Sequence, residues 1–433
     1  MFEIREKPEM VERAMLVSIY FDHSEAHEKQ AMLDELEDLV SNLGIEIVGK
    51  HLIRSREKHA KFLCGTGKAQ EVKELAEACS ADCVVFDNML APSQQREWER
   101  LINELVIDRE EVILDIFAKR ARTREATLQV ELARMQYSLP RMAKMWSHLD
   151  RQGGGAGGGA TRGEGEKQIE VDRRLARNRI EVIQKELVEV TKQRATQRKE
   201  RERQALSTAA IVGYTNAGKS SLLSLVSGSE VMAKDMLFAT LDTTTRKLEL
   251  SDGQTLLMTD TVGFIRNLPH RLVEAFKSTL EEAVLADFLI QVVDASDPEA
   301  IRHYETTLEV LGELGAKDKP MIVALNKIDL VPEEDRPALI SRLEEGIDGV
   351  VLPISVKEAQ GIDALLEECV KMLANRVSKT FYCIPYDRTD LVATMHRDGK
   401  ILTCEYEEAG TVVEAILPLA FANKIRQYAI DRE

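Results

Sequence analysis

One short segment of the chain has the residue types and spacing of a phosphate-binding loop. It is Gly213-Tyr214-Thr215-Asn216-Ala217-Gly218-Lys219-Ser220, which fits the pattern G-x-x-x-x-G-K-[ST] between a strand-like run, 209–212, and an apolar, helix-compatible run that begins at Ser221. Such a loop directs successive backbone N–H groups at a phosphate, near the positive end of the following helix. Lys219 would reach the β- and γ-phosphates, and the Ser220 hydroxyl would bind Mg²⁺. The alternative is an ordinary glycine-containing turn, against which the motifs downstream argue.

A second motif could recognise the base. The apolar run 321–325 is typical of a buried parallel strand and ends in Asn326-Lys327-Ile328-Asp329, which resembles the guanine-specificity motif of P-loop GTPases. The Asp329 carboxylate can accept hydrogen bonds from guanine N1–H and the 2-amino group, a donor pair that adenine lacks. Asn326 would hold the loop and face the other edge of the purine, and the Lys327 stem would pack over the ring. After the next strand, Ser355-Val356-Lys357 resembles the S-A-K motif, whose backbone N–H meets guanine O6. We therefore predict that the nucleotide is GTP.

A third motif supplies the expected metal and γ-phosphate contacts. The strand-like run 255–259 is followed by Asp260-Thr261-Val262-Gly263, which resembles the D-x-x-G motif of GTPases. Asp260 would hold Mg²⁺ through water, and the Gly263 N–H would meet the γ-phosphate. Threonines crowd the segment Phe238-Ala239-Thr240-Leu241-Asp242-Thr243-Thr244-Thr245, and one of them should complete the Mg²⁺ shell. The resemblance favours Thr240, whereas the chemistry alone leaves Thr243 to Thr245 open.

Two residues bear on the rate of hydrolysis. Phe264 follows Gly263, where Ras-like proteins have the glutamine that orients the attacking water. Phenylalanine cannot hydrogen-bond a water molecule, so we expect slow hydrolysis by the isolated protein. Asn216 stands where several GTPase families hold a monovalent cation such as K⁺ beside the phosphates. The alternative for Asn216 is a residue that simply favours a tight turn.

The elements that position these motifs predict a P-loop GTPase domain over residues 207–375. Before it, residues 1–115 alternate strand-like and helical segments and predict an N-terminal α/β domain. Residues 116–206 predict a helical hairpin with a glycine-rich tip, 153–165, that holds eight of the chain's 24 glycines. Residues 376–433 predict a small C-terminal α/β domain. The predicted fold class is therefore α/β with these four parts, in keeping with a length of 433 residues.

Composition narrows the class of protein. The chain is 44% hydrophobic and has no apolar run long enough for a membrane span and no signal-peptide core, so we expect a globular cytoplasmic protein. Its six cysteines lack metal-ligand spacing and indicate thiols in a reducing compartment. The formal net charge is −16, yet residues 119–203 contain 21 Lys and Arg against 12 Asp and Glu. Such a basic block in an acidic protein favours a local phosphate-contacting element, and the alternative is a solvated helix of mixed charge.

The motifs together resemble the HflX family of GTPases. The stretch Arg162-Gly163-Glu164-Gly165-Glu166-Lys167-Gln168-Ile169-Glu170 carries that family's R-G-x-G-E-x-Q-[IL]-E pattern, with Glu164 where the family usually has proline. The resemblance covers essentially the whole chain. It implies a monomeric cytoplasmic GTPase that uses Mg²⁺, binds the large (50S) ribosomal subunit and its rRNA, and splits or rescues stalled ribosomes under stress such as heat. It also implies imperfect purine selectivity, with ATP use proposed for the N-terminal region.

The resemblance also implies a set of site residues. The expected catalytic residues are Lys219, Thr240 and Gly263, and the expected Mg²⁺ ligands are Ser220, Thr240 and Asp260. The expected nucleotide contacts are Gly213 to Ser221, Phe238 to Asp242, Asp260 to Gly263, Asn326 to Asp329 and Ser355 to Lys357.

Two other functions remain open from the sequence. One is a GTP-dependent signalling switch for a protein or a membrane-associated partner, with peripheral membrane association. The other is an RNA-remodelling NTPase that also uses ATP. The basic hairpin favours a ribosomal partner over the signalling switch. The lack of a helicase motif set argues against the RNA-remodelling NTPase.

Overall fold

The computed structural model describes residues 11–141, 162–203, 206–228, 237–238, 240–269, 272, 277–345, 349–373 and 377–430. These residues divide into two compact units, which are described separately. The first contains the described residues up to Glu189, with the short segments that end at Phe238 and begin at Arg266. The second contains the remainder.

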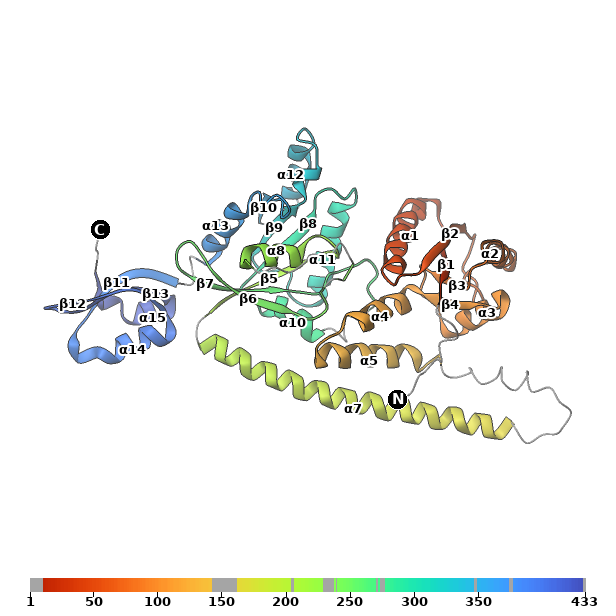
Figure 1. Ribbon diagram of the computed structural model, residues 1–433, viewed down its shortest axis with the longest axis horizontal. Helices are drawn as coiled ribbons and strands as arrows, with labels where there is room; N and C mark the ends of the chain where they lie inside the picture. The colour runs from red at the N-terminus through yellow and green to blue at the C-terminus, as the bar shows by residue number, and fades with distance from the viewer. Residues whose placement is uncertain are drawn as a thin grey trace. The chain divides into compact units, whose positions relative to one another are not determined.

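A four-stranded parallel sheet forms the centre of the N-terminal part, in the order β2-β1-β3-β4 (Figure 1). Strands β1 and β3 are buried along nearly their whole length, which explains why they are continuous apolar runs. Trp98 fills the core beside Phe62 and Phe86. The elements are β1 (Arg13–Tyr20), η1 (His23–Glu25), α1 (Ala26–Ser41), β2 (Glu46–Arg54), α2 (Thr66–Cys79), β3 (Cys83–Phe86), α3 (Pro92–Ile102) and β4 (Leu105–Asp108).

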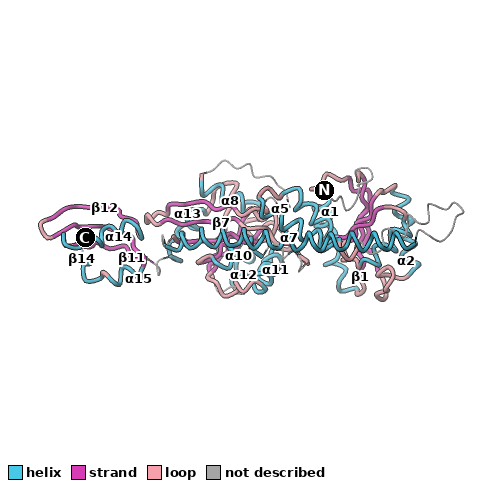
Figure 2. Tube along the Cα trace, turned by 90° about the horizontal axis from the view of Figure 1, so that it is seen from below, coloured by secondary structure: helices cyan, strands magenta, loops and turns pink. Residues whose placement is uncertain are grey.

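Three helices follow this sheet: α4 (Arg109–Arg120), α5 (Arg124–Ser138) and α7 (Arg162–Arg203). Residue 115, the predicted end of the N-terminal domain, lies inside α4. The predicted first arm of the hairpin is interrupted at residues 121–123, where the Thr123 side chain accepts a hydrogen bond from Ala126 N and caps α5. Figure 2 shows α7 as one uninterrupted helix.

Helices α5 and α7 pack as an antiparallel pair. Ile183 of α7 is fully buried against Leu128, Leu132 and Met135 of α5. Ion pairs join Arg124 to Glu186 and Glu131 to Arg179. The earlier residue of α5 thus pairs with the later residue of α7, as antiparallel helices require. Residues 153–161 of the predicted glycine-rich tip, 153–165, are not among the described residues. Its last four residues, 162–165, form the start of α7.

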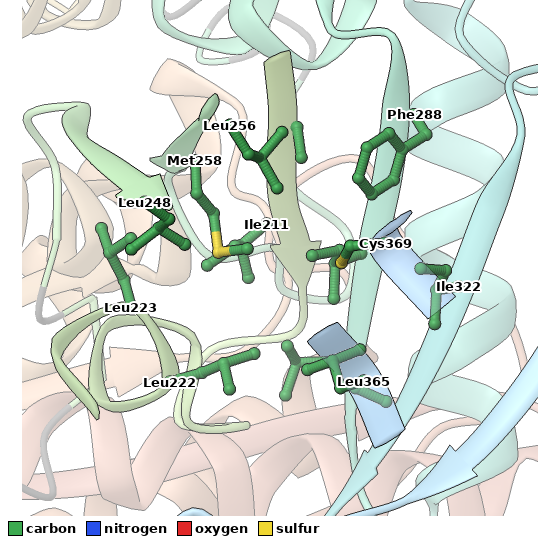
Figure 3. Packing of buried hydrophobic residues seen from close by; sticks show 14 of the residues in the cluster. Ile211, Leu222, Leu223, Leu248, Leu256, Met258, Phe288, Ile322, Leu365 and Cys369 are labelled. Carbon is green, nitrogen blue, oxygen red and sulfur yellow. The ribbon is translucent and has the colours of Figure 1, made fainter. Parts of the chain in front are cut away.

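The predicted GTPase domain is built on a six-stranded sheet in the order β10-β9-β8-β5-β7-β6, in which only β6 is antiparallel to its neighbour. Side chains of the strands, of α8 and of α13 form its core, among them Ile211, Leu222, Phe288 and Leu365 (Figure 3). The elements are β5 (Ser207–Gly213), α8 (Lys219–Ser227), β6 (Thr244–Glu249), β7 (Thr255–Asp260), α10 (Lys277–Leu285), β8 (Phe288–Asp294), α11 (Ala300–Glu313), β9 (Met321–Asn326), η3 (Ile328–Leu330), α12 (Arg336–Glu344), β10 (Val350–Pro353) and α13 (Ile362–Leu373).

The C-terminal part is an antiparallel sheet in the order β12-β13-β11-β14. Tyr382, Met395 and Leu417 lie in its core, together with residues of α14 and α15. The elements are β11 (Val377–Ile384), η4 (Tyr386–Arg388), α14 (Thr389–Asp398), β12 (Lys400–Glu407), β13 (Gly410–Pro418), α15 (Leu419–Lys424), η5 (Arg426–Tyr428) and β14 (Ala429–Ile430). The predicted fold class, α/β with a P-loop GTPase domain, a helical region and flanking sheet domains, is confirmed.

Within the described ranges, no helix combines the length and apolarity that crossing a bilayer requires. All six cysteines are free thiols, and burial raises the pKa of the Cys64 thiol to about 11.

Candidate nucleotide-binding site

The loop between β5 and α8 has the shape that its sequence predicts. Gly213 and Gly218 adopt φ values of 141° and 100°, in the region that favours glycine. A Cβ atom on Gly213 would lie 2.3 Å from the Val292 carbonyl oxygen, and one on Gly218 would lie 2.2 Å from Asn326 Nδ2. Neither position therefore has room for a side chain. Asn216, between them, is exposed with φ 60°, a conformation that asparagine tolerates better than most residues.

The three predicted Mg²⁺ ligands meet at one point. Ser220 Oγ donates to Asp260 Oδ2 at 2.6 Å and lies 2.6 Å from Thr240 Oγ1. Asp260 is 2% exposed, and its Oδ1 atom has no hydrogen-bond partner among the described residues. Two hydroxyls and a carboxylate are oxygen ligands of the kind that Mg²⁺ prefers. An acceptor oxygen left without a partner in the interior is a further reason to place a cation here.

The contacts distinguish Thr240 from Thr245, another threonine of its segment. The Thr245 hydroxyl is instead hydrogen-bonded to the Thr259 hydroxyl, with the two Oγ1 atoms 2.9 Å apart. Thr240 is the threonine that the structure brings to Ser220. This geometry supports Thr240, the residue that the family resemblance favours.

Lys219 is buried beside the predicted Mg²⁺ ligands. It is 6% exposed, and its Nζ donates to the Tyr214 carbonyl oxygen at 2.6 Å. Burial lowers the pKa of Lys219 from 10.5 to about 8, and the nearby Asp260 carboxylate opposes the shift. Burial likewise raises the pKa of Asp260, although Lys219 and Ser220 act in the other direction. Both charged forms are thus costly until a phosphate and a cation compensate them.

The D-x-x-G segment is joined directly to the phosphate-binding loop. Thr215 N donates to the Phe264 carbonyl oxygen at 2.8 Å, and Phe264 N donates to the Gly213 carbonyl oxygen at 3.1 Å. A Cβ atom on Gly263 would lie 2.8 Å from Thr215 Cγ2 and 3.0 Å from Thr215 Cα, so a side chain here would press on the phosphate-binding loop. The Phe264 side chain is 1% exposed and lies in the interior, where it cannot orient a water molecule. Thr215 Oγ1 is buried without a hydrogen-bond partner in the described part of the chain.

The base-reading motif lies at the end of β9. Asp329 Oδ1 is buried and has no hydrogen-bond partner within the described ranges, as an acceptor reserved for guanine would require. Asn326 links two loops, because its Nδ2 donates to the Ala217 carbonyl oxygen at 2.8 Å and its Oδ1 accepts from Val356 N at 3.0 Å. It therefore holds the phosphate-binding loop against the segment 355–357, and its amide oxygen is already used within the protein. Ser355 is fully buried and its Oγ accepts from Glu358 N, whereas the Lys357 side chain is 79% exposed.

Several predicted contact residues have other surroundings. Thr261 Oγ1 donates to the Ile211 carbonyl oxygen at 2.7 Å, which is a contact between neighbouring strands. Phe238 packs edge to face on Phe117 of α4, with ring centroids 4.7 Å apart. Leu241 and Val262 are buried apolar residues. Ala239 lies outside the described residues.

Two side chains near the site were missed by the sequence reasoning. Asp294, the last residue of β8, pairs with Lys327. His303 of α11 stacks on the Tyr214 ring, with centroids 3.7 Å apart and planes inclined by 11°. Asp294 could have been found, because it is a carboxylate directly after a buried strand, as Asp260 is. His303 is one residue of an amphipathic helix, and nothing in the local sequence distinguishes it.

Three family models match the chain. They are "GTP-binding GTPase N-terminal" over residues 30–118, "GTP-binding GTPase Middle Region" over residues 120–201 and "50S ribosome-binding GTPase" over residues 208–327.

Curated relatives extend the likeness over the whole chain. GTPase HflX of Akkermansia muciniphila is 78% identical over 437 residues, which cover 100% of both chains. GTPase HflX of Chlamydia pneumoniae is 39% identical, over 99% of this chain and 90% of the relative. GTPase HflX of Escherichia coli K12 is 41% identical, over 93% and 92% respectively. Among solved structures, a GTP-binding protein from Sulfolobus solfataricus in complex with GDP is 24% identical over 84% of this chain and 99% of that one, with a TM-score of 0.43. Because this TM-score is below 0.5, the family assignment rests on the sequence relatives.

Proposed function

Since the chain belongs to the HflX family of GTPases and is itself a GTPase, we propose that it hydrolyses GTP with Mg²⁺ at the site between β5, β7 and β9 and acts on the large ribosomal subunit. The observation that carries the nucleotide assignment is the buried Asp329 Oδ1 just beyond β9, which has no hydrogen-bond partner among the described residues. Guanine offers two donors to such a carboxylate, and adenine offers none at the same edge. The alternative of an RNA-remodelling enzyme that uses ATP at this site is therefore disfavoured.

The residues divide the work of hydrolysis among them. Ser220, Thr240 and Asp260 would hold Mg²⁺, which supplies positive charge to the β- and γ-phosphates. Lys219 neutralises the charge that develops on the transferred phosphoryl group, and the Gly263 N–H donates to a γ-phosphate oxygen. The backbone of Gly213 to Ser221 cradles the phosphates at the start of α8. Asn326, Lys327, Ile328 and Asp329, with the segment 355–357, receive the base.

The ribosomal partner is supported by the middle region as well as by the family model. On α7, the exposed residues Arg174, Arg177, Lys185 and Lys192 recur at spacings that place them on one face of the helix, together with Glu181. A basic helix face can contact the phosphates of rRNA, and such contacts do not depend on base sequence. We propose that the chain binds the 50S subunit in the cytoplasm as a monomer, and that it splits or rescues stalled ribosomes, notably under heat stress.

Co-migration with ribosomal subunits tests this proposal. Purified protein is mixed with 70S ribosomes and with separated subunits, in GDP, in a non-hydrolysable GTP analogue and in the corresponding ATP analogue, and is followed through a sucrose gradient. We expect co-migration with the large subunit and loss of the 70S peak with the GTP analogue, and neither with the ATP analogue. Lys219→Ala is the matched control and should lose the nucleotide dependence. A protein that stays at the top of the gradient under all conditions would instead be a switch for a non-ribosomal partner.

A further inference from the structure

The loop after β8 lies directly beside the base-reading motif. Asp294, the last residue of β8, is the register partner of Asn326, the last residue of β9. Ala295 N donates to the Asn326 carbonyl oxygen at 2.8 Å, which holds the two strand ends together. A side chain on Asp294 is therefore placed within reach of the residues that follow Asn326.

Both carboxylate oxygens of Asp294 are used. Its Oδ1 accepts from Ser296 N at 3.0 Å and from Ser296 Oγ at 2.6 Å. Its Oδ2 lies 2.6 Å from Lys327 Nζ. Asp329, two residues beyond Lys327, has in contrast an Oδ1 atom with no partner among the described residues. The two carboxylates therefore have different roles, and Asp294 is not a second reader of the base edge.

The ion pair restrains a lysine that would otherwise have many conformations. The Asp294 and Lys327 side chains are 17% and 27% exposed, so solvent screens the pair less than it screens a surface pair. Lys327 has φ 61° and ψ 29°, a left-handed conformation that directs its side chain away from the path of the strand. A lysine stem carries several rotatable bonds, and fixing its ammonium limits the positions of its methylene groups.

We propose that Asp294 is a positioning residue for guanine binding: it holds the Lys327 ammonium at the strand end so that the methylene stem lies over the purine ring. The inference rests on the proposed GTP site, in which Lys327 packs on the base. Asp294 then acts on nucleotide affinity through Lys327, and it has no part in phosphoryl transfer. Purine-edge recognition stays with Asp329.

A double-mutant cycle on nucleotide affinity tests this role. Asp294→Asn keeps the shape and removes the charge, and Lys327→Met keeps an apolar stem and removes the ammonium. We expect Asp294→Asn to weaken GDP binding about three- to fivefold, as loss of a partly exposed ion pair does. The turnover number at saturating GTP should change less than twofold, and the preference for GDP over IDP should stay as in the wild type. In the Lys327→Met background, Asp294→Asn should have no further effect on the Kd for GDP.

Three controls separate the possible outcomes. Asp318→Asn removes an exposed carboxylate from the loop between α11 and β9 and should leave the Kd unchanged. Ser296→Ala removes the Oγ contact to Asp294 and leaves the lysine pair, so its effect should be smaller than that of Asp294→Asn. Asp294→Glu, which moves the carboxylate by one methylene group, replaces Asp294→Asn in the same cycle should the latter not fold. Equal losses with and without the Lys327 ammonium would overturn the proposal, and so would an unchanged Kd. Failure of the wild type to bind GDP would overturn the GTP site itself.

Discussion

In the proposed site, the choice of purine depends on Asp329. Its Oδ1 has no hydrogen-bond partner in the part of the chain that the structure describes. We therefore predict that Asp329→Asn exchanges an acceptor for a donor and so favours xanthine, which has a carbonyl where guanine has its 2-amino group. Hydrogen bonds to a charged group contribute about 1.5–3 kcal/mol, so GTP binding should weaken by about one to two orders of magnitude while XTP binding improves. Competition of GTP and XTP against a fluorescent nucleotide measures the ratio. A variant with the wild-type GTP-over-XTP preference would remove Asp329 from the base site.

The buried Lys219 predicts how affinity depends on pH. Its pKa of about 8 in the free protein means that the ammonium is about half deprotonated at pH 8 and mostly deprotonated above it, whereas the nucleotide phosphates would bind the charged form. Binding must then take up a proton, so GTP affinity should fall as the pH rises through 8 and be independent of this group well below 8. The same shift means that this group's contribution to the free energy of unfolding increases with pH between about 8 and 10.5, because there the unfolded chain binds more protons.

Calorimetric titrations in buffers of different ionisation enthalpy, between pH 7 and 9, measure the proton uptake. Lys219→Arg is the control, because arginine stays charged at every pH in this range. The variant thus removes the titration of the side chain, while any titration of the guanine ring of the nucleotide is the same for both proteins. The variant should bind more weakly, without the proton uptake near pH 8. Identical proton uptake by the two proteins would assign the effect to another group.

At the scale of elements, the contact between α5 and α7 depends on few side chains. Ile183 is fully buried among Leu128, Leu132 and Met135, whereas its neighbour Val182 is 44% exposed. Ile183→Ala should therefore lower the free energy of unfolding of this helix pair by about 2–4 kcal/mol, and Val182→Ala by less than about 0.5 kcal/mol. Hydrogen exchange of the α5 and α7 amides measures this local effect. A global unfolding curve would not isolate it, because the chain has two compact units that need not unfold together. Equal protection in the two variants would contradict this packing.

At the scale of the whole molecule, hydrolysis should depend on the partner. The Phe264 ring is buried and cannot orient the attacking water, so we expect slow GTP turnover by the free protein and faster turnover on large ribosomal subunits. Release of phosphate, measured with and without 50S particles and in sodium or potassium, tests both the activation and the proposed cation at Asn216. Turnover that is equal with and without 50S particles would remove the activation, and turnover equal in the two salts would remove the cation.

A replacement in the middle region tests the link to the ribosome. Since α7 begins at Arg162, a short neutral turn in place of residues 153–161 leaves that helix whole. We expect unchanged turnover of the free protein, together with weaker 50S binding, a lower salt dependence and no splitting of 70S ribosomes. Normal splitting by this variant would show that the segment only links two helices.

The sequence by itself determined the class of the fold, and it predicted the residues of the proposed site. Gly213 to Ser220, Asp260 and Asp329 lie at or just beyond the ends of strands at motif spacing, and the backbone geometry of the phosphate loop requires glycine at Gly213 and Gly218. Only the tertiary structure decided which side chains meet. It brought Thr240 to Ser220, joined Asn326 to both Ala217 and Val356, paired Asp294 with Lys327, and interrupted the helix at residues 121–123. The contacts at the nucleotide site follow from the order in which β9, β8, β5 and β7 lie side by side, and strand order is set by packing between segments far apart in the chain, which no local pattern encodes.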